Sequence, residues 1–98
     1  MNALLVGADR LGNIPAVLSE YGIRVAGHVS GRQPAHQKRV ALPARVELVI
    51  LFTDFLGHNV MRQFREAARE RGLPLLCSRR STSSLRQSVA GCIGRRAS

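Results

Sequence analysis

The sequence predicts a single three-layer α/β domain built on a four-stranded parallel sheet. Short apolar runs alternate with segments of helical spacing, four times along the chain. The central run, residues 48–52, is apolar at every position, as expected for a strand covered on both faces of a parallel sheet. Short strands joined by helices imply right-handed crossovers. We therefore expect a doubly wound sheet of order 2-1-3-4, which is half of a Rossmann or flavodoxin-like sheet.

The bulk properties fit one domain and give it a strong positive charge. The 98 residues are 45% apolar, enough for an aliphatic core. No run approaches the roughly 18 apolar residues of a membrane span, and no basic region precedes the first apolar run, so we expect a cytoplasmic protein without a membrane partner. The net charge of +9 favours anionic partners. Arginine outnumbers lysine fourteen to one, a bias that phosphate binding and a GC-rich genome would both explain.

The first strand is expected over residues 3–6, almost at the N-terminus. The turn 7–12 follows it and leads into a helix. Asn13 can cap this helix, and Pro15 fits its first turn. A Tyr-Gly pair at residues 21–22 marks the end of the helix.

The second strand is expected over residues 23–27, with His28 at its end. The segment 30–44 is the least regular part, because glycine and two prolines interrupt it. We expect one short helix there, between Pro34 and Leu42.

The third strand, 48–52, is followed by a polar turn and a long basic helix. Apolar residues recur at helical spacing from about residue 60 to residue 68. His58 lies in or just before the first turn of this helix. Gly72 gives the C-terminal cap signal, and Pro74 prevents the helix from continuing.

The fourth strand is expected over residues 73–77, and the last turn over residues 78–84. A closing helix should run from about residue 83 to residue 92. We therefore predict one α/β domain over residues 1–93, with a frayed basic tail at 94–98.

Parallel topology would bring the turns that follow the strands to one edge of the sheet, which we call the strand-end edge. With order 2-1-3-4, the connections from the first and third strands leave in opposite directions and open a crevice there. Residues distant in sequence should therefore converge at this edge. The turns concerned are 7–10, 28–31, 53–58 and 78–83.

Four short motifs lie on these turns, and together they resemble a known family. They are Val6-Gly7-Ala8-Asp9-Arg10, His28-Val29-Ser30-Gly31, Thr53-Asp54 with His58, and Arg80-Ser81 with Ser83, Ser84 and Leu85. Their order and spacing resemble the bacterial family catalogued as domain of unknown function 2325, over about residues 4–89. The resemblance implies a small Rossmann-like fold with a site on the strand ends. It brings no established activity.

The chain departs from the family pattern at several positions. Family members commonly carry Cys, Ser and Cys where this chain has Phe55, Gly57 and Ala68. These departures argue against a cysteine-based metal, haem or redox role. The two cysteines present, Cys77 and Cys92, are too few for a zinc framework or a disulfide scaffold, and Cys77 is expected to be buried.

Two turns have the composition of anion sites. The first leads from a strand into a helix, where free backbone N–H groups and the helix dipole favour an anion. The last joins guanidinium groups and hydroxyls to a helix N-terminus. An ordinary tight turn and a hydroxyl cap explain the same residues without a ligand. The predicted ligand-binding and phosphate-binding residues are Gly7, Asp9, Arg10, Gly31, Thr53, Arg79, Arg80, Ser81, Thr82 and Ser83.

His28, Asp54 and His58 all fall on the strand-end edge. They are the candidates for acid–base catalysis or for an open metal site. The alternative is that each histidine hydrogen-bonds a neighbouring turn and that the aspartate pairs with an arginine. We predict no resident metal and no cofactor.

The long helix carries a basic stripe opposite its apolar face. Arg62, Arg65 and Arg69 follow His58 at steps of four, three and four residues. Such a stripe could follow a nucleic-acid backbone. A solvated helix face is the alternative.

The first functional hypothesis is a non-catalytic module that binds a phosphate-bearing ligand, either a nucleotide or a nucleic-acid backbone, at the strand-end edge. One alternative is a small hydrolytic or metal-assisted enzyme. Another is a subunit that docks an acidic protein partner. The exposed edges of a small sheet would also allow a homodimer.

Overall fold

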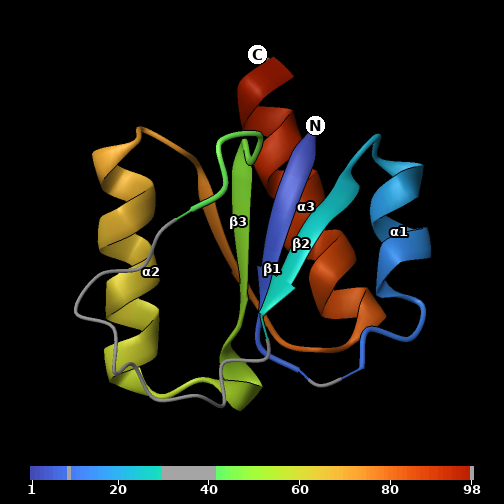
Figure 1. Ribbon diagram of the computed structural model, residues 1–98. Coiled ribbons are helices and arrows are strands. Elements are labelled where there is room, and N and C mark those ends of the chain that lie inside the picture. The colour runs from blue at the N-terminus through green and yellow to red at the C-terminus, as the bar shows by residue number, and fades with distance from the viewer. Residues whose placement is uncertain (9, 30–41, 98) are drawn as a thin grey trace.

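The computed structural model describes residues 1–8, 10–29 and 42–97. Figure 1 shows three layers, with α2 on one face of the sheet and α1 and α3 on the other. Within the described ranges, no helix is long and apolar enough to cross a membrane. The elements are β1 (Asn2–Val6), α1 (Ile14–Glu20), β2 (Arg24–Val29), β3 (Leu48–Phe52), the 3-10 turn η1 (Thr53–Phe55), α2 (His58–Glu70), β4 (Leu75–Ser78) and α3 (Thr82–Ala97).

The sheet has the predicted order, β2-β1-β3-β4, and every strand pair is parallel. The predicted α/β fold is therefore confirmed. β1 and β3 form the centre, with Ala3 beside Leu48 and Val6 beside Leu51. Each residue of β3 is buried, as its unbroken apolar run predicts.

The alternation of side chains along β3 divides the core between two layers. Leu48, Ile50 and Phe52 pack with the apolar stripes of α1 and α3. Val49 and Leu51 face the other way and pack with Phe64 and Ala68 of α2, among others. Alternate side chains of β3 therefore pack against the helices on opposite faces of the sheet. A shift of one residue would exchange the two sets of side chains, so this packing fixes the register of β3.

Several boundaries differ from the prediction by one or two residues. β2 ends at Val29, so His28 lies inside the strand. The register with β1 shifts by one residue, because Ala3 pairs with Val25 and Leu4 pairs with Gly27. β4 starts at Leu75, two residues later than expected. The short helix expected between residues 34 and 42 lies outside the described residues.

Three local predictions are wrong. Asn13 makes no side-chain cap to α1. Cys77 is exposed, because β4 is an edge strand. α3 starts at Thr82 and continues to Ala97, so the closing helix ends five residues after its predicted end at residue 92. The glycines in this helix cost about 1 kcal/mol each, which is not enough to end a helix that is anchored by packing.

Arg71 fixes the segment that leads into β3. It is the C-terminal cap residue of α2, and its guanidinium donates to backbone carbonyls that a loop would otherwise leave to water. The sequence patterns gave no indication of this role. The accepting carbonyls belong to Leu42 and Pro43, each at 2.9 Å, to Ala44 at 3.2 Å and to Val46 at 3.5 Å.

Glu20 and Arg86 join α1 to α3 across their outer surfaces. The guanidinium donates to both carboxylate oxygens, at 3.1 and 2.7 Å. These bonds hold the pKa of the Glu20 carboxyl below its usual value. A lowered pKa in the folded state means that the pair stabilises the fold when the carboxylate is ionised.

Replacing Arg71 by Ala should lower the free energy of unfolding by roughly 1–2 kcal/mol, because several carbonyls lose a charged donor at once. Urea denaturation measures this. The matched control is Arg24→Ala, an exposed arginine whose side chain makes no hydrogen bond or ion pair to residues that the structure describes. Equal effects of the two substitutions would contradict the assigned role of Arg71.

The contribution of Glu20 to the stability of the fold should depend on pH. Because its folded-state pKa is depressed, the stabilisation is present above the unfolded-state pKa and is lost as the pH falls through the folded-state pKa. The melting temperatures of wild type and Glu20→Gln should therefore converge between about pH 6 and about pH 3. A difference that stays constant over this range would show that the ion pair does not contribute.

Candidate functional site

Arg80 joins three of the four turns that were predicted to converge. Its backbone N–H donates to Asp54 Oδ2 at 3.4 Å. Its side-chain Nε donates to the carbonyl of Arg10 at 2.8 Å, and Nη2 donates to the same oxygen. Figure 1 shows the turns after β1, β3 and β4 meeting at one edge of the sheet, where all three helices also begin.

His28, near the end of β2, joins that strand to the first turn. Its Nε2 lies 2.7 Å from the carbonyl oxygen of Ala8 and 3.1 Å from that of Gly7. A carbonyl oxygen only accepts, so Nε2 carries the proton. The backbone N–H of Gly7 donates in turn to the carbonyl of Val29 at 2.8 Å. The imidazole therefore braces the β1–α1 turn, which is the structural alternative considered for it.

The β1–α1 turn has an unusual backbone. Gly7 has φ +102° and Ala8 has φ +66°, in the region that L residues avoid. A Cβ on Gly7 would lie 3.0 Å from the carbonyl oxygen of Phe52. The glycine is therefore required by both conformation and space. Ala8 adopts the same left-handed region with a buried methyl group.

The serines of the β4–α3 turn mostly bond one another and the backbone. Ser81 Oγ accepts from the N–H of Ser84 at 3.1 Å, which is an N-cap of α3. Ser84 Oγ accepts from the N–H of Arg79 at 3.3 Å. Ser78 Oγ lies 2.7 Å from the Arg79 carbonyl, and Thr53 Oγ1 donates to the Ser78 carbonyl at 3.5 Å. Sequence reasoning assigned no role to Ser78 and no bond to Ser84. A serine directly before a helix, as Ser81 is, was the available signal for the N-cap.

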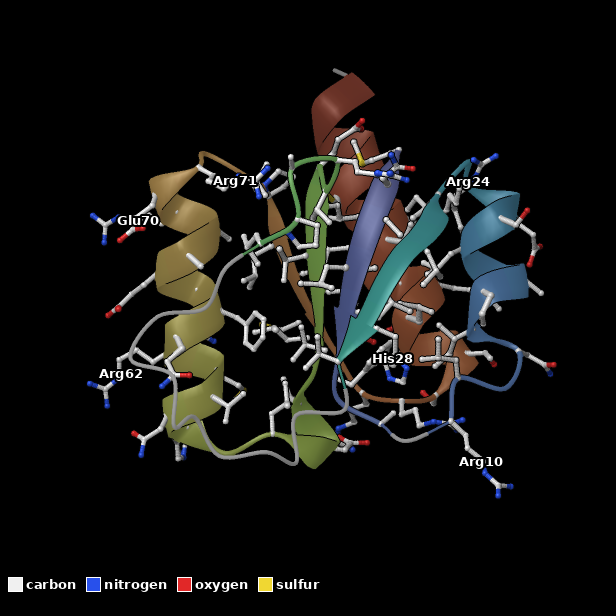
Figure 2. All side chains as sticks on the ribbon, in the orientation of Figure 1. Arg10, Arg24, His28, Arg62, Glu70 and Arg71 are labelled. Carbon is white, nitrogen blue, oxygen red and sulfur yellow. The ribbon has the colours of Figure 1, made fainter. Side chains whose placement is uncertain are left out.

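Four predicted ligand residues keep their functional groups available. Arg10, Arg79, Thr82 and Ser83 are exposed, and their side chains make no hydrogen bond or ion pair within the described part of the chain. Figure 2 shows the Arg10 side chain pointing away from the body of the protein at the strand-end edge. Asp9 and Gly31, which were also predicted as ligand residues, lie outside the described residues.

His28, Asp54 and His58 lie at this edge, and in the described part of the chain no hydrogen bond or ion pair joins one of these side chains to another. His28 bonds the β1–α1 turn, and Asp54 accepts from Arg80. His58 is the exposed first residue of α2. Residues 1–8, 10–29 and 42–97 contain no group of three or more His, Cys, Asp or Glu side chains arranged to hold a metal ion.

A family model matches nearly the whole chain. It belongs to a family described as "Uncharacterized protein conserved in bacteria (DUF2325)", and the match covers residues 2–92. No curated protein and no solved structure matches the chain. The matched range contains all four turns of the strand-end edge.

Replacing Gly7 by Ala should lower the free energy of unfolding by roughly 1–3 kcal/mol, because the new methyl group meets Phe52 and the φ is unfavourable. Gly57→Ala is the control, since Gly57 has a negative φ and open space around its Cβ position. Urea denaturation compares them. A Gly7→Ala protein as stable as Gly57→Ala would refute the requirement for glycine in this turn.

Proposed function

The chain belongs to the DUF2325 family, and because that family is described as uncharacterised, we propose a function from the site itself. The protein is a non-catalytic module that binds a phosphate-bearing ligand, a nucleotide or a nucleic-acid backbone, at the strand-end edge. The ligand lies over the β4–α3 turn and contacts the first turn of α3.

The observation that carries this proposal is the N-terminus of α3 near two arginines, Arg10 and Arg79, whose side chains have no partner among the described residues. α3 has 16 residues, so its dipole favours an anion at its start. Ser81 caps the N–H of Ser84, while the N–H groups of Thr82 and Ser83 precede the first intrahelical bond. Their hydroxyls are exposed at the same place. Amide donors, hydroxyls and guanidinium groups together are what a phosphate needs.

The arginines of the edge divide into two roles. Arg79 and Arg10 are the phosphate-binding side chains, since both are exposed and unpaired among the described residues. Arg80 is a positioning residue, because its side chain is already bonded to the Arg10 carbonyl. This bond holds the Arg10 backbone against the β4–α3 turn. His28 and Asp54 position the turns in the same way.

The surroundings also support an anionic ligand. Asp54 is the one acidic residue among the described part of the strand-end edge, and its Oδ2 accepts from Arg80. The whole chain carries +9. The enzyme alternative and the docking alternative have no comparable observation in their favour among the described residues.

Replacing Arg79 by Gln should weaken binding of a nucleoside diphosphate about tenfold, because one charge-assisted hydrogen bond to phosphate is lost. Isothermal titration calorimetry at about 50 mM and about 200 mM salt measures the affinity. The control is Arg24→Gln, which removes the same charge at the opposite end of the sheet (Figure 2).

Equal losses of affinity from the two substitutions would mean that the overall positive charge attracts the nucleotide and that no specific site binds it. The proposal would then fail. It would also fail if wild-type protein bound no nucleotide, no inorganic phosphate and no oligonucleotide at low salt.

A further inference from the structure

The outer side of α2 carries a basic stripe that the nucleotide site does not use. The stripe is defined by His58, Arg62, Arg65 and Arg69, all of them exposed. At about 100° per residue these four positions fall within an arc of about 60°. At about 1.5 Å per residue they extend over about 16 Å.

The charges of the stripe are not neutralised within the described part of the chain. Arg62 Nη2 donates to Asn59 Oδ1 at 3.4 Å, and Arg65 Nη2 lies 3.8 Å from Cys77 Sγ. Neither contact is with an acid. The ion pair that the described residues do form joins Glu20 to Arg86 on other helices. Three guanidinium groups therefore face solvent in one row, which favours a partner with repeated negative charges.

The stripe and the strand-end edge form one continuous surface. Cys77, which contacts Arg65, precedes Arg79 by two residues on β4 and the turn that follows it. Two extended residues span about 7 Å. An open hollow of about 550 Å³ lies along the stripe, with His58, Met61, Arg62 and Arg65 among the residues that line it. His58 starts α2 at the strand-end edge (Figure 1).

We propose that the stripe binds the phosphodiester backbone of a single nucleic-acid strand, which continues to Arg79 at the strand-end edge. This inference rests on the proposed function and specifies its ligand as a polymer. A stacked strand advances about 3.4 Å per phosphate, so the stripe spans about five phosphates. A mononucleotide at Arg79 would leave the stripe empty.

The positions of the acidic side chains on α2 favour a single nucleic-acid strand over a duplex. Glu66 and Glu70 lie on α2 beside the stripe, at about 80° and 120° from His58 around the helix axis. Figure 2 shows Glu70 extended outward from α2. An α-helix in the major groove faces backbones on both sides, and these carboxylates would repel the second one. A single strand avoids them by following the arginines.

The stripe has no phenylalanine, tyrosine or tryptophan on which bases could stack. The chain has four aromatic residues, of which Phe52 and Phe64 are buried in the core. Stacking on exposed rings is the usual contribution of bases to single-strand binding. Binding through phosphates alone should tolerate any sequence and depend strongly on salt.

The test compares two double variants with the same loss of charge, Arg62→Gln/Arg65→Gln and Arg24→Gln/Arg45→Gln. Fluorescence anisotropy measures binding of a labelled single-stranded oligonucleotide over a series of salt concentrations. Each lost phosphate contact should reduce the slope of log K against log salt by about 0.7. The stripe variant should therefore lose about 1.4 from the slope, and the control variant should keep the wild-type slope.

Calorimetry of a nucleoside diphosphate with the same variants separates this inference from the proposed function. Unchanged diphosphate binding with weakened oligonucleotide binding supports the stripe. Equal oligonucleotide slopes in both double variants would overturn it, even if Arg79→Gln still weakened diphosphate binding. Tighter binding of a duplex than of the single strand would overturn the single-strand assignment, as would a stripe variant that loses affinity only for an acidic peptide.

Discussion

The parallel pairing of β1 with β3 determines where everything else in this protein lies. The two strands are almost wholly buried and occupy the centre of the sheet. Their connections go to opposite faces, α1 to one side and α2 to the other (Figure 1). Because parallel strands all end at the same edge, turns far apart in sequence are brought into contact there. The position of the site is therefore set by the topology of the sheet, and the individual residues of the turns determine its chemistry.

Hydrogen bonds then fix the turns relative to one another. Arg80 bonds the Arg10 carbonyl and Asp54, and His28 bonds the carbonyls of Gly7 and Ala8. In the described residues, no buried side-chain nitrogen or oxygen lacks a partner. Polar groups that position the turns are thus distinct from those that remain for a ligand. This division gives a site in which the backbone of the turns is held in place before the ligand arrives, while the exposed side chains of Arg10 and Arg79 become ordered only on binding.

The fold could be predicted because its signals are strong and local. The unbroken apolar run of β3 is typical of a strand covered on both faces, and the apolar spacing of α2 is typical of a helix. The order 2-1-3-4 was expected from the common doubly wound pattern, and the structure has it. The convergence of the turns follows from that order. Gly7 was recognisable as a turn glycine, but its contact with Phe52 depends on a strand more than forty residues away.

Other features could not be predicted, because they depend on which polar groups meet in space. The pattern around Arg71 is that of a solvated helix end, yet its guanidinium holds the segment before β3. Arg80 was assigned to phosphate on composition, and the structure uses its side chain as a brace. Cys77 lies in an apolar strand but is exposed, since edge position follows from tertiary pairing rather than from composition.

The most direct test of the phosphate site is a titration of ¹⁵N-labelled protein with inorganic phosphate, followed by the backbone amide shifts. Our account predicts that the amides of Thr82 and Ser83 move together and saturate, because these two N–H groups lie in the first turn of α3 and precede its first intrahelical bond. The amide of Arg24, at the opposite end of the sheet, should remain unchanged. Shifts spread evenly over the surface, or confined to the opposite end, would contradict a site at the strand-end edge.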